Sequence, residues 1–337
     1  MSRMIRFHQF GPAEVLKIEQ VESGQPGPGE VLLHVEAIGV SWHDVLWRQN
    51  LAPSQARLPA GIGHELAGEV LAVGEGVDDL SVGDKVASFP AHSANDYPAY
   101  GEQLVMPRSS LTRYPEQLSA QQAAVHYTAL LTGYFAYVDL ARAETGQSVL
   151  LTDAAHCGGP AMLQLGKALG LRMIAATKDA DDREALLALG ADKVIVTEEE
   201  DLVGRIAKIT DGRGVDIVLD GLGGPQMCLL GDVLAPRGRL VLYGLQGGNE
   251  TPFPACAAFQ KNIQFFVHCL GNFTGKPELS IPQDEVALQR ALVAINQMTR
   301  DGLLTTEVGK VLPLEAAAEA HRYMEGCPKG GRVVLVP

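Results

Sequence analysis

The stretch Ser148–Gly170, SVLLTDAAHCGGPAMLQLGKALG, decides how this chain folds. A run of apolar residues ends at Thr152, a loop of small residues follows, and a helix is expected to begin near Pro160. Proline suits the first turn of a helix because no hydrogen bond within the helix is lost there. Small residues let the main chain approach a pyrophosphate, whose charge meets the free N–H groups at the helix N-terminus. The segment therefore predicts a strand, a dinucleotide-binding loop and a helix.

The glycine pattern of this loop is degraded. The three glycines of the usual G-x-G-x-x-G pattern fall on Ala154, His156 and Gly159. Taken alone, the loop is also compatible with a tight strand-to-helix turn that binds no ligand, so the segments around it have to decide. The residues predicted to contact a cofactor here are Ala155, His156, Cys157, Gly158 and Gly159.

The loop also carries a histidine, a cysteine and a carboxylate. His156 and Cys157 either fill space at the loop tip or act there, the histidine by donating to a phosphate and the cysteine as a reactive thiol at a helix N-terminus. Asp153 would repel a pyrophosphate, so we expect it to point away or to cap main-chain groups.

Strands and helices alternate after this loop. Helices are predicted over residues 120–143, 160–170, 181–189, 201–210 and 225–235, and strands over 148–152, 172–176, 193–196, 215–219 and 239–243. Apolar strands separated by amphipathic helices are typical of a parallel sheet that is covered on both faces. The fold class is therefore α/β, with a doubly wound parallel sheet over residues 122–262.

The first third of the chain has a different pattern. Short strands are predicted at Glu30–Gly39, Glu65–Val73 and Lys85–Phe89, separated by glycine and proline, which favours a small antiparallel barrel or sandwich. After residue 262 the chain is expected to return to this β-rich domain. A helix over 284–301 and the terminal strand Arg332–Val336 have no β-α-β partner of their own in this interpretation.

Composition excludes several classes of function. A chain of 337 residues is longer than a single hydrophobic core usually accommodates, which indicates two domains. The net charge of −13 argues against a nucleic-acid partner, and no apolar run is long enough for a membrane span. The start lacks a secretory signal, so we expect a cytoplasmic protein. The cysteines are scattered and expected to be mostly buried thiols rather than disulfides or metal ligands: Cys157, Cys228, Cys256, Cys269 and Cys327.

The end of the second strand indicates the cofactor. Enzymes that use NAD place an acidic residue there for the ribose 2′-OH. This chain has Thr177 and Lys178 instead, and a lysine there can bind a 2′-phosphate through a charged hydrogen bond of about 1.5–3 kcal/mol. Asp179 weakens the argument, and the alternative is that Lys178 is simply solvated. The pattern favours NADPH over NADH.

Several stretches resemble the medium-chain dehydrogenase/reductase family, and in particular its quinone oxidoreductases. They are Gly61–Gly74 (GIGHELAGEVLAVG), Val82–Val86 (VGDKV), Phe89–Glu102 (FPAHSANDYPAYGE), Gly190–Asp192 (GAD), Val215–Gly224 (VDIVLDGLGG) and Arg239–Gly244 (RLVLYG). The resemblance implies a GroES-like β-rich catalytic domain over residues 1–121 and 263–337 and a Rossmann domain over residues 122–262. It also implies a homodimer paired through the edge of the Rossmann sheet.

The resemblance bears on zinc as well. The Cys, His and Cys that hold catalytic zinc in alcohol dehydrogenases of the family fall on Ser41, His64 and Thr128. One ligand of three cannot hold zinc in a tetrahedral site, and there is no cysteine between residues 86 and 106 for a structural zinc. We therefore expect no metal. The alternative is a site rebuilt from His43, His64 and Glu65.

Without a metal, the resemblance implies hydride transfer from NADPH to an activated acceptor, either a quinone or an α,β-unsaturated carbonyl. A hydrogen-bond donor then stabilises the developing enolate. Tyr97 is the first candidate because a phenol donates without being charged at pH 7. Each candidate also has a non-catalytic interpretation. Tyr97 could be an aromatic residue at the rim that closes the pocket, and His64 could be a former zinc ligand that is now hydrogen-bonded to a neighbour. Asp44 could orient its loop. The catalytic candidates are Ser41, Asp44, His64, Tyr97 and Thr128.

The resemblance also implies further cofactor contacts, and other functions stay open. Thr132 is expected near the nicotinamide, and Lys178 and the main chain near Gly221 and Gly244 near the phosphates and ribose. Thr197 stands where the quinone oxidoreductases often carry a tyrosine, so a stacking contact there is in doubt. The alternatives are an accessory enoyl reductase of a synthase pathway, a non-catalytic NADPH-binding protein, and a metal-dependent dehydrogenase.

Overall fold

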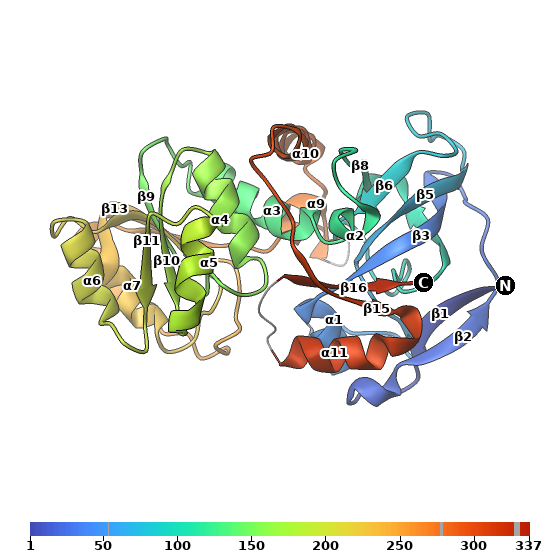
Figure 1. Ribbon diagram of the computed structural model, residues 1–337, viewed down its shortest axis with the longest axis horizontal. Coiled ribbons are helices and arrows are strands. Elements are labelled where there is room, and N and C mark those ends of the chain that lie inside the picture. The colour runs from blue at the N-terminus through green and yellow to red at the C-terminus, as the bar shows by residue number, and fades with distance from the viewer. Residues whose placement is uncertain (53, 277–278, 327–330) are drawn as a thin grey trace. The chain divides into compact units, whose positions relative to one another are not determined.

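The chain divides into two compact units. The computed structural model describes residues 1–52, 54–276, 279–326 and 331–337 (Figure 1). Unit 1 comprises Met1–Thr128, Gly271–Arg300 and Thr306–Pro337, and unit 2 comprises Ala129–Leu270 and Asp301–Thr305. In the colours of Figure 1, unit 1 is mostly blue to cyan and red, and unit 2 is mostly green to orange.

Unit 2 is built on a six-stranded parallel sheet. Its strands run in the order β11-β10-β9-β12-β13-β14, and every neighbouring pair is parallel. Numbered along the chain from β9, this is the order 3-2-1-4-5-6 of a Rossmann domain, which confirms the predicted fold class. The strands are β9 (Ser148–Leu151), β10 (Arg172–Thr177), β11 (Lys193–Val196), β12 (Val215–Asp220), β13 (Leu234–Leu242) and β14 (Gln264–Val267).

The helices of unit 2 pack around this sheet. Figure 1 shows α4, α5, α6 and α7 around the strands of the unit. Asp201 begins α6 by accepting a hydrogen bond from the main-chain N–H of Gly204, and Ile206 on the same helix is buried in the core with Leu150 and Val218. The helices are α3 (Tyr127–Tyr134), followed by a π-helical turn at Phe135–Leu140, α4 (Gly159–Ala168), α5 (Arg183–Ala188), α6 (Leu202–Ile209), α7 (Met227–Val233) and α8 (Ala255–Lys261).

Unit 1 is the β-rich unit. A seven-stranded sheet has the order β15-β16-β3-β5-β6-β8 with β7 paired to β3, and a second sheet has the order β2-β1-β4. The long strand β3 (Glu30–Val40) forms the middle of the larger sheet, and its Val31, Leu33 and Ile38 are fully buried. The other strands are β1 (Ser2–Phe7), β2 (Lys17–Val21), β4 (Ala60–Gly61), β5 (Glu65–Val73), β6 (Lys85–Ser88), β7 (Gln103–Pro107), β8 (Leu111–Arg113), β15 (Val308–Pro313) and β16 (Arg332–Val336).

The helices of unit 1 come from all three of its chain segments. They are α1 (Trp42–Arg48), α2 (Ala120–Ala123), α9 (Gly271–Thr274), α10 (Glu285–Arg300) and α11 (Ala317–Glu325). The terminal strand β16 was expected to have no partner of its own, and this is wrong. It pairs in parallel with β15, and α11 connects the two strands.

The two units divide after Thr128 and after Leu270, later in the chain than the domain boundaries expected from the sequence. At the first, Tyr127 donates to Asn296 of α10 and His126 bonds Thr299 of the same helix, so these residues belong to unit 1. At the second, β14 was not predicted, yet it extends the parallel sheet beyond residue 262. The single helix expected over 120–143 is divided into α2, α3 and the π-helical turn.

The cysteines differ from the expectation of buried thiols. Cys157, Cys228, Cys256 and Cys269 are all exposed, and Cys327 lies outside the described residues. Cys256 lies on α8, and Cys269 follows the edge strand β14.

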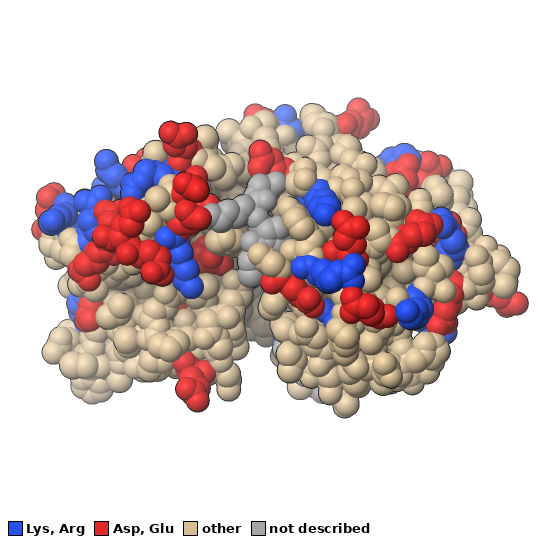
Figure 2. All heavy atoms as spheres, turned by 60° about the horizontal axis from the view of Figure 1, so that its bottom comes forward, with Lys and Arg blue, Asp and Glu red and all other residues tan. Residues whose placement is uncertain are grey.

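Charged side chains form many surface pairs. Figure 2 shows acidic and basic residues interspersed over the face that it displays. Lys85 contacts Glu36 at 2.7 Å and Glu69 at 2.9 Å, for example. Exposed pairs of this kind contribute about 0–1 kcal/mol each, so they order the surface more than they stabilise the fold. Among the described helices, none has the length and apolarity needed to cross a bilayer.

Candidate active site

The predicted cofactor residues all lie in unit 2, and most of them follow the carboxyl ends of adjacent strands. The loop 152–158 follows β9, and Thr177 is the last residue of β10. Gly221 follows β12, and Gly244 lies just beyond β13. Because these parallel strands are neighbours, their carboxyl ends share one edge of the sheet, which is where dinucleotides bind in doubly wound folds.

Two glycines at this edge allow close approach of main chains. A Cβ at Gly159 would lie 2.5 Å from the carbonyl oxygen of Ala154, so only glycine lets α4 begin so near the end of β9. A Cβ at Gly244 would lie 2.3 Å from the carbonyl oxygen of Gly221. The loops therefore form a narrow cradle of main-chain atoms, as a bound pyrophosphate requires.

The carboxylate of the loop is paired inside the loop. His156 Nδ1 lies 2.8 Å from Asp153 Oδ1, so the imidazole sits against the charge that would otherwise repel a phosphate. Asp153 and Cys157 both have φ of 50°, a left-handed conformation that gives the loop its sharp turn. The amide of Gln246 donates to Cys157 Sγ at 3.2 Å, which joins this loop to the one that follows β13.

Sequence reasoning missed Asp220, the last residue of β12. Its carboxylate accepts from the hydroxyl of Thr152 at 2.6 Å and from the main-chain N–H groups of Leu222 and Gly223. Burial raises the pKa of Asp220, and these hydrogen bonds oppose that rise. Asp220 thus holds the loop of Gly221 in place, and an aspartate between an apolar strand and the glycines of GLGG was the available signal.

The end of β10 presents an exposed lysine. The hydroxyl of Thr177 donates to Asp182 at 2.5 Å, so its side chain is engaged within the loop. Asp179 accepts from the main-chain N–H of Asp181 and caps the turn that follows. Lys178 is exposed at the same strand end, in the position for which a 2′-phosphate contact is predicted.

The predicted catalytic residues all lie in unit 1, and three of them form one cluster. Ser41 begins α1, and its main-chain N–H and hydroxyl each donate to Asp44 Oδ2 at 2.9 Å. His64 Nδ1 lies 3.1 Å from Asp44 Oδ1. Asp44 is fully buried, which disfavours its charge, but the hydrogen bond from His64 and the surrounding histidines lower its pKa. The buried aspartate therefore carries its charge against His64.

Two more histidines surround His64. Its ring centroid lies 4.6 Å from that of His43, which is exposed, and 5.9 Å from that of His92, which is stacked on it. Neither ring nitrogen of His92 hydrogen-bonds another described residue, and burial lowers its pKa to about 3, so this imidazole is neutral. The nearby main chain of Phe89 raises the pKa of His92 slightly, which opposes the larger effect of burial. His92 lies in Phe89–Glu102, one of the stretches that resemble the family, but it was not predicted as a site residue.

One of the three residues of the alternative metal site, Glu65, is ion-paired through one of its carboxylate oxygens. Arg332 donates to Glu65 Oε2 at 2.5 Å, so the carboxylate next to His64 is held by an ion pair inside unit 1. Among the described residues, no three histidines, cysteines or carboxylates have an arrangement suited to a metal ion.

Tyr97 is hydrogen-bonded outside the cluster around Asp44, and Thr128 lies at the end of a segment of unit 1. The hydroxyl of Tyr97 donates to Glu30 Oε1 at 2.6 Å, and this hydrogen bond raises the pKa of Tyr97 to about 12. Glu30 begins β3 and Ser41 directly follows it, so Tyr97 is bound at the opposite end of this long strand from Ser41. Thr128 is the last residue of this segment of unit 1, and Thr132 lies in unit 2, where its carbonyl accepts from His268. The role of Tyr97 as a donor stays a prediction.

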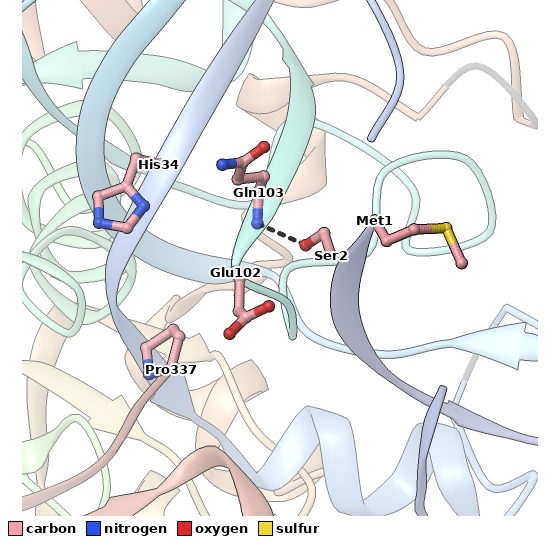
Figure 3. Close-up of a pocket in the computed structure, with 6 residues that line it drawn as sticks. All are labelled: Met1, Ser2, His34, Glu102, Gln103 and Pro337. Atoms are coloured by element: carbon pink, nitrogen blue, oxygen red, sulfur yellow. Dashed lines mark hydrogen bonds between the residues drawn. The ribbon is translucent and has the colours of Figure 1, made fainter. Parts of the chain in front are cut away.

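The cavity in Figure 3 is not part of this site. It has a volume of about 210 Å³ in unit 1, and the hydroxyl of Ser2 accepts from the main-chain N–H of Gln103 beside it. None of the predicted site residues lines it. The residues that line it are Met1, Ser2, His34, Glu102, Gln103 and Pro337.

Comparison with known proteins covers both units. Residues 27–116 match the family described as alcohol dehydrogenase GroES-like domain, and residues 159–283 match the family described as zinc-binding dehydrogenase. A quinone oxidoreductase of Pseudomonas aeruginosa is 29% identical over 338 residues, which is 100% of both chains. A synaptic vesicle membrane protein VAT-1 homolog of Rattus norvegicus is 30% identical over 93% of this chain and 78% of that protein.

Two further matches bear on the chemistry. The 2-haloacrylate reductase of a Burkholderia species is 28% identical over 98% of this chain and 97% of its own length. The structure of Escherichia coli quinone oxidoreductase complexed with NADPH superposes with a TM-score of 0.86, at 28% identity over 99% of this chain and 100% of that one. The chain therefore belongs to the medium-chain dehydrogenase/reductase family of oxidoreductases, as its motifs indicated, with quinone oxidoreductases among its full-length relatives.

Proposed function

We propose that this protein transfers a hydride from NADPH to a quinone or an α,β-unsaturated carbonyl compound without a metal ion. The observation that carries the proposal is the cradle at the carboxyl edge of the parallel sheet, with a lysine and no acidic residue directly at the end of β10. Relatives that match over their whole length include quinone oxidoreductases and a 2-haloacrylate reductase, and one of their structures contains NADPH.

The glycine loops would bind the cofactor. Gly158 and Gly159 bring the first N–H groups of α4 to a pyrophosphate, with Ala155, His156 and Cys157 forming the loop before them. Lys178 would bind the 2′-phosphate beside Thr177, and the main chain at Gly221 and Gly244 would approach the ribose and nicotinamide, with Thr132 near the ring. The bound cofactor supplies a hydride at its nicotinamide ring.

The cluster around His64 would supply the proton. When a hydride adds to the β carbon of an enone, the π pair of the C=C bond forms a new double bond between the α carbon and the carbonyl carbon. The π pair of the C=O bond moves onto oxygen as an enolate. His64 donates a proton to this product, and Asp44, which contacts His64 Nδ1, holds the ring in place for the transfer. Ser41 holds Asp44 in place through two hydrogen bonds. Thr128 is proposed to line the acceptor site.

Metal is left out of the proposal because of the ligands at hand. Glu65 Oε2 is held by Arg332, and among the described residues no three histidines, cysteines or carboxylates are arranged to hold a metal ion. A zinc site takes three or four protein ligands.

A second copy of the chain is proposed to pair with the edge of the sheet in unit 2. Strand β14 is the last strand in the sheet order, so one of its main-chain edges is unpaired within the described chain. Val267, the last residue of β14, is an apolar side chain that is 64% exposed. Continuation of the sheet into a partner would cover this strand.

The proposal is tested by a screen of acceptors on metal-analysed protein, with NADPH and NADH in parallel. We expect oxidation of NADPH with small quinones such as phenanthrenequinone or with conjugated enones, and weaker oxidation of NADH. Faster reduction of enoyl chains bound to an acyl carrier would assign the protein to a synthase pathway instead. Calorimetric binding of NADPH without turnover of any acceptor would overturn the catalytic proposal.

A further inference from the structure

A chain of buried polar groups leads to Asp44 from the opposite side to His64. Arg48 Nε donates to His321 Nδ1 at 3.4 Å. His321 Nε2 lies 3.4 Å from the hydroxyl of Tyr100, which lies 3.3 Å from Asp44 Oδ2. Each of these four side chains is fully buried, and they come from α1, from the segment before β7, and from α11.

The direction of every hydrogen bond in this chain can be worked out. An arginine side chain can only donate, so His321 Nδ1 must be the ring nitrogen with the lone pair. Burial lowers the pKa of His321 to about 4, so its ring is neutral and carries its single proton on Nε2. That N–H donates to the oxygen of Tyr100, and Tyr100 uses its own proton toward Asp44. Burial raises the pKa of Tyr100, so that proton is retained.

The same reasoning assigns the proton on His64. An ionised carboxylate is only an acceptor, so the contact between Asp44 Oδ1 and His64 Nδ1 requires a proton on Nδ1. In a neutral His64 ring the lone pair is then on Nε2. When the ring is protonated, Nε2 is the nitrogen whose proton can leave toward an acceptor.

A buried series of hydrogen-bonded side chains destabilises the fold unless each polar group has a partner. The charge of Arg48 is balanced by Glu325, and another of its N–H groups donates to the carbonyl of Gly11. Asp44 receives two donors from Ser41, and the chain adds a third at the same oxygen, Oδ2. The chain therefore ends on the one atom that also sets the orientation of the carboxylate toward His64.

We propose that Tyr100 and His321 are positioning residues, which hold the Asp44 carboxylate so that His64 keeps a proton on Nδ1 and presents Nε2 to the acceptor. The part of this inference that concerns the acceptor rests on the proposed function. The part that concerns the proton on His64 does not.

The first experiment is ring ¹⁵N NMR of the full-length protein labelled at histidine, with His64 assigned by comparison with His64→Gln. At a pH where the ring is neutral, the shifts should show a proton on Nδ1 of His64. A proton on Nε2 instead would overturn the inference, whatever the enzyme turns over.

The second experiment removes links of the chain. Tyr100→Phe should lower kcat about threefold to tenfold, the usual worth of one hydrogen bond, and leave the KM for NADPH unchanged. The Nδ1 proton of His64 should also exchange with water faster. His321→Leu should act in the same way, whereas His321→Gln retains an acceptor for Arg48 and a donor for Tyr100 and should restore most of kcat.

Tyr137→Phe is the matched control, because Tyr137 is a buried tyrosine of unit 2 whose hydroxyl donates to the carbonyl of Met162 at 3.1 Å. It should leave kcat and the His64 proton unchanged. Wild-type kcat and proton exchange in Tyr100→Phe would refute the positioning role. A wild-type protein that reduces no acceptor would refute the proposed function, and the NMR result would still decide the inference.

Discussion

Replacing Asp44 by asparagine tests the most buried part of the candidate site. Three donors meet at Asp44 Oδ2, from the main chain and hydroxyl of Ser41 and from Tyr100, whereas among the described residues His64 alone meets Oδ1. The amide oxygen of Asp44→Asn should therefore take the place of Oδ2. Its NH₂ group then faces His64 Nδ1, which has to become the acceptor, and the proton of a neutral His64 moves to Nε2.

The expected loss of activity follows from this change of tautomer and charge. The asparagine presents a donor to His64 Nδ1 in place of the carboxylate acceptor, so the contact that holds the ring for proton donation is lost. General acid catalysis contributes about 10²- to 10⁴-fold to a rate, so kcat should fall by at least about a hundredfold. Replacing charged by neutral hydrogen bonds should lower the free energy of unfolding by about 1–3 kcal/mol.

The assay is steady-state oxidation of NADPH with the best acceptor, together with thermal unfolding. Asp216→Asn is the matched control, since Asp216 also accepts from the main chain and hydroxyl of one serine, Ser148, at 2.8 Å each. The control should lose stability but retain kcat. If Asp44→Asn retains kcat within about threefold of Asp216→Asn, then the assignment of His64 as the proton donor is refuted.

Four further outcomes are expected. Lys178→Ala should raise the Kd for NADPH about tenfold in calorimetry and leave the Kd for NADH unchanged, because only NADPH carries the 2′-phosphate; equal effects on both would show that the lysine is merely solvated. Tyr97→Phe distinguishes the two candidate donors: a loss of about tenfold or more in kcat/KM would assign the role to Tyr97, whereas a change below about threefold, as expected while its hydroxyl is bound to Glu30, would leave the role to His64. Val267→Lys should convert a dimer to a monomer in light scattering, because a charge at the exposed edge of β14 blocks sheet pairing; an unchanged mass would exclude this edge as the interface. Treatment with a chelator, followed by metal analysis, should leave activity unchanged, and activity lost on chelation and restored by zinc would favour the metal-dependent alternative.

Local sequence was sufficient for the Rossmann unit and for placing most of the predicted cofactor residues at one edge of its sheet. The strand, loop and helix around residues 148–170 are contiguous, and the alternation of later strands with helices specifies a parallel sheet whose carboxyl ends meet. Sequence reasoning missed β14, a short strand at the edge of the sheet. Its four residues are half-buried or exposed, so the strand lacks the fully buried character of the central strands. The pairing of β15 with β16 was missed for a related reason, because alternate residues of β15 are exposed.

The catalytic half of the site required the tertiary structure. Ser41 and Asp44 are close in sequence and form a capping box, so their contact is local. His64, Tyr100 and His321 reach Asp44 only because β-sheet pairing and the packing of α11 bring segments up to 277 residues apart together. Sequence alone identified which side chains could carry the chemistry. The direction of each hydrogen bond, and so the nitrogen of His64 that holds the proton, depends on which buried donor meets which oxygen, and that is decided by packing.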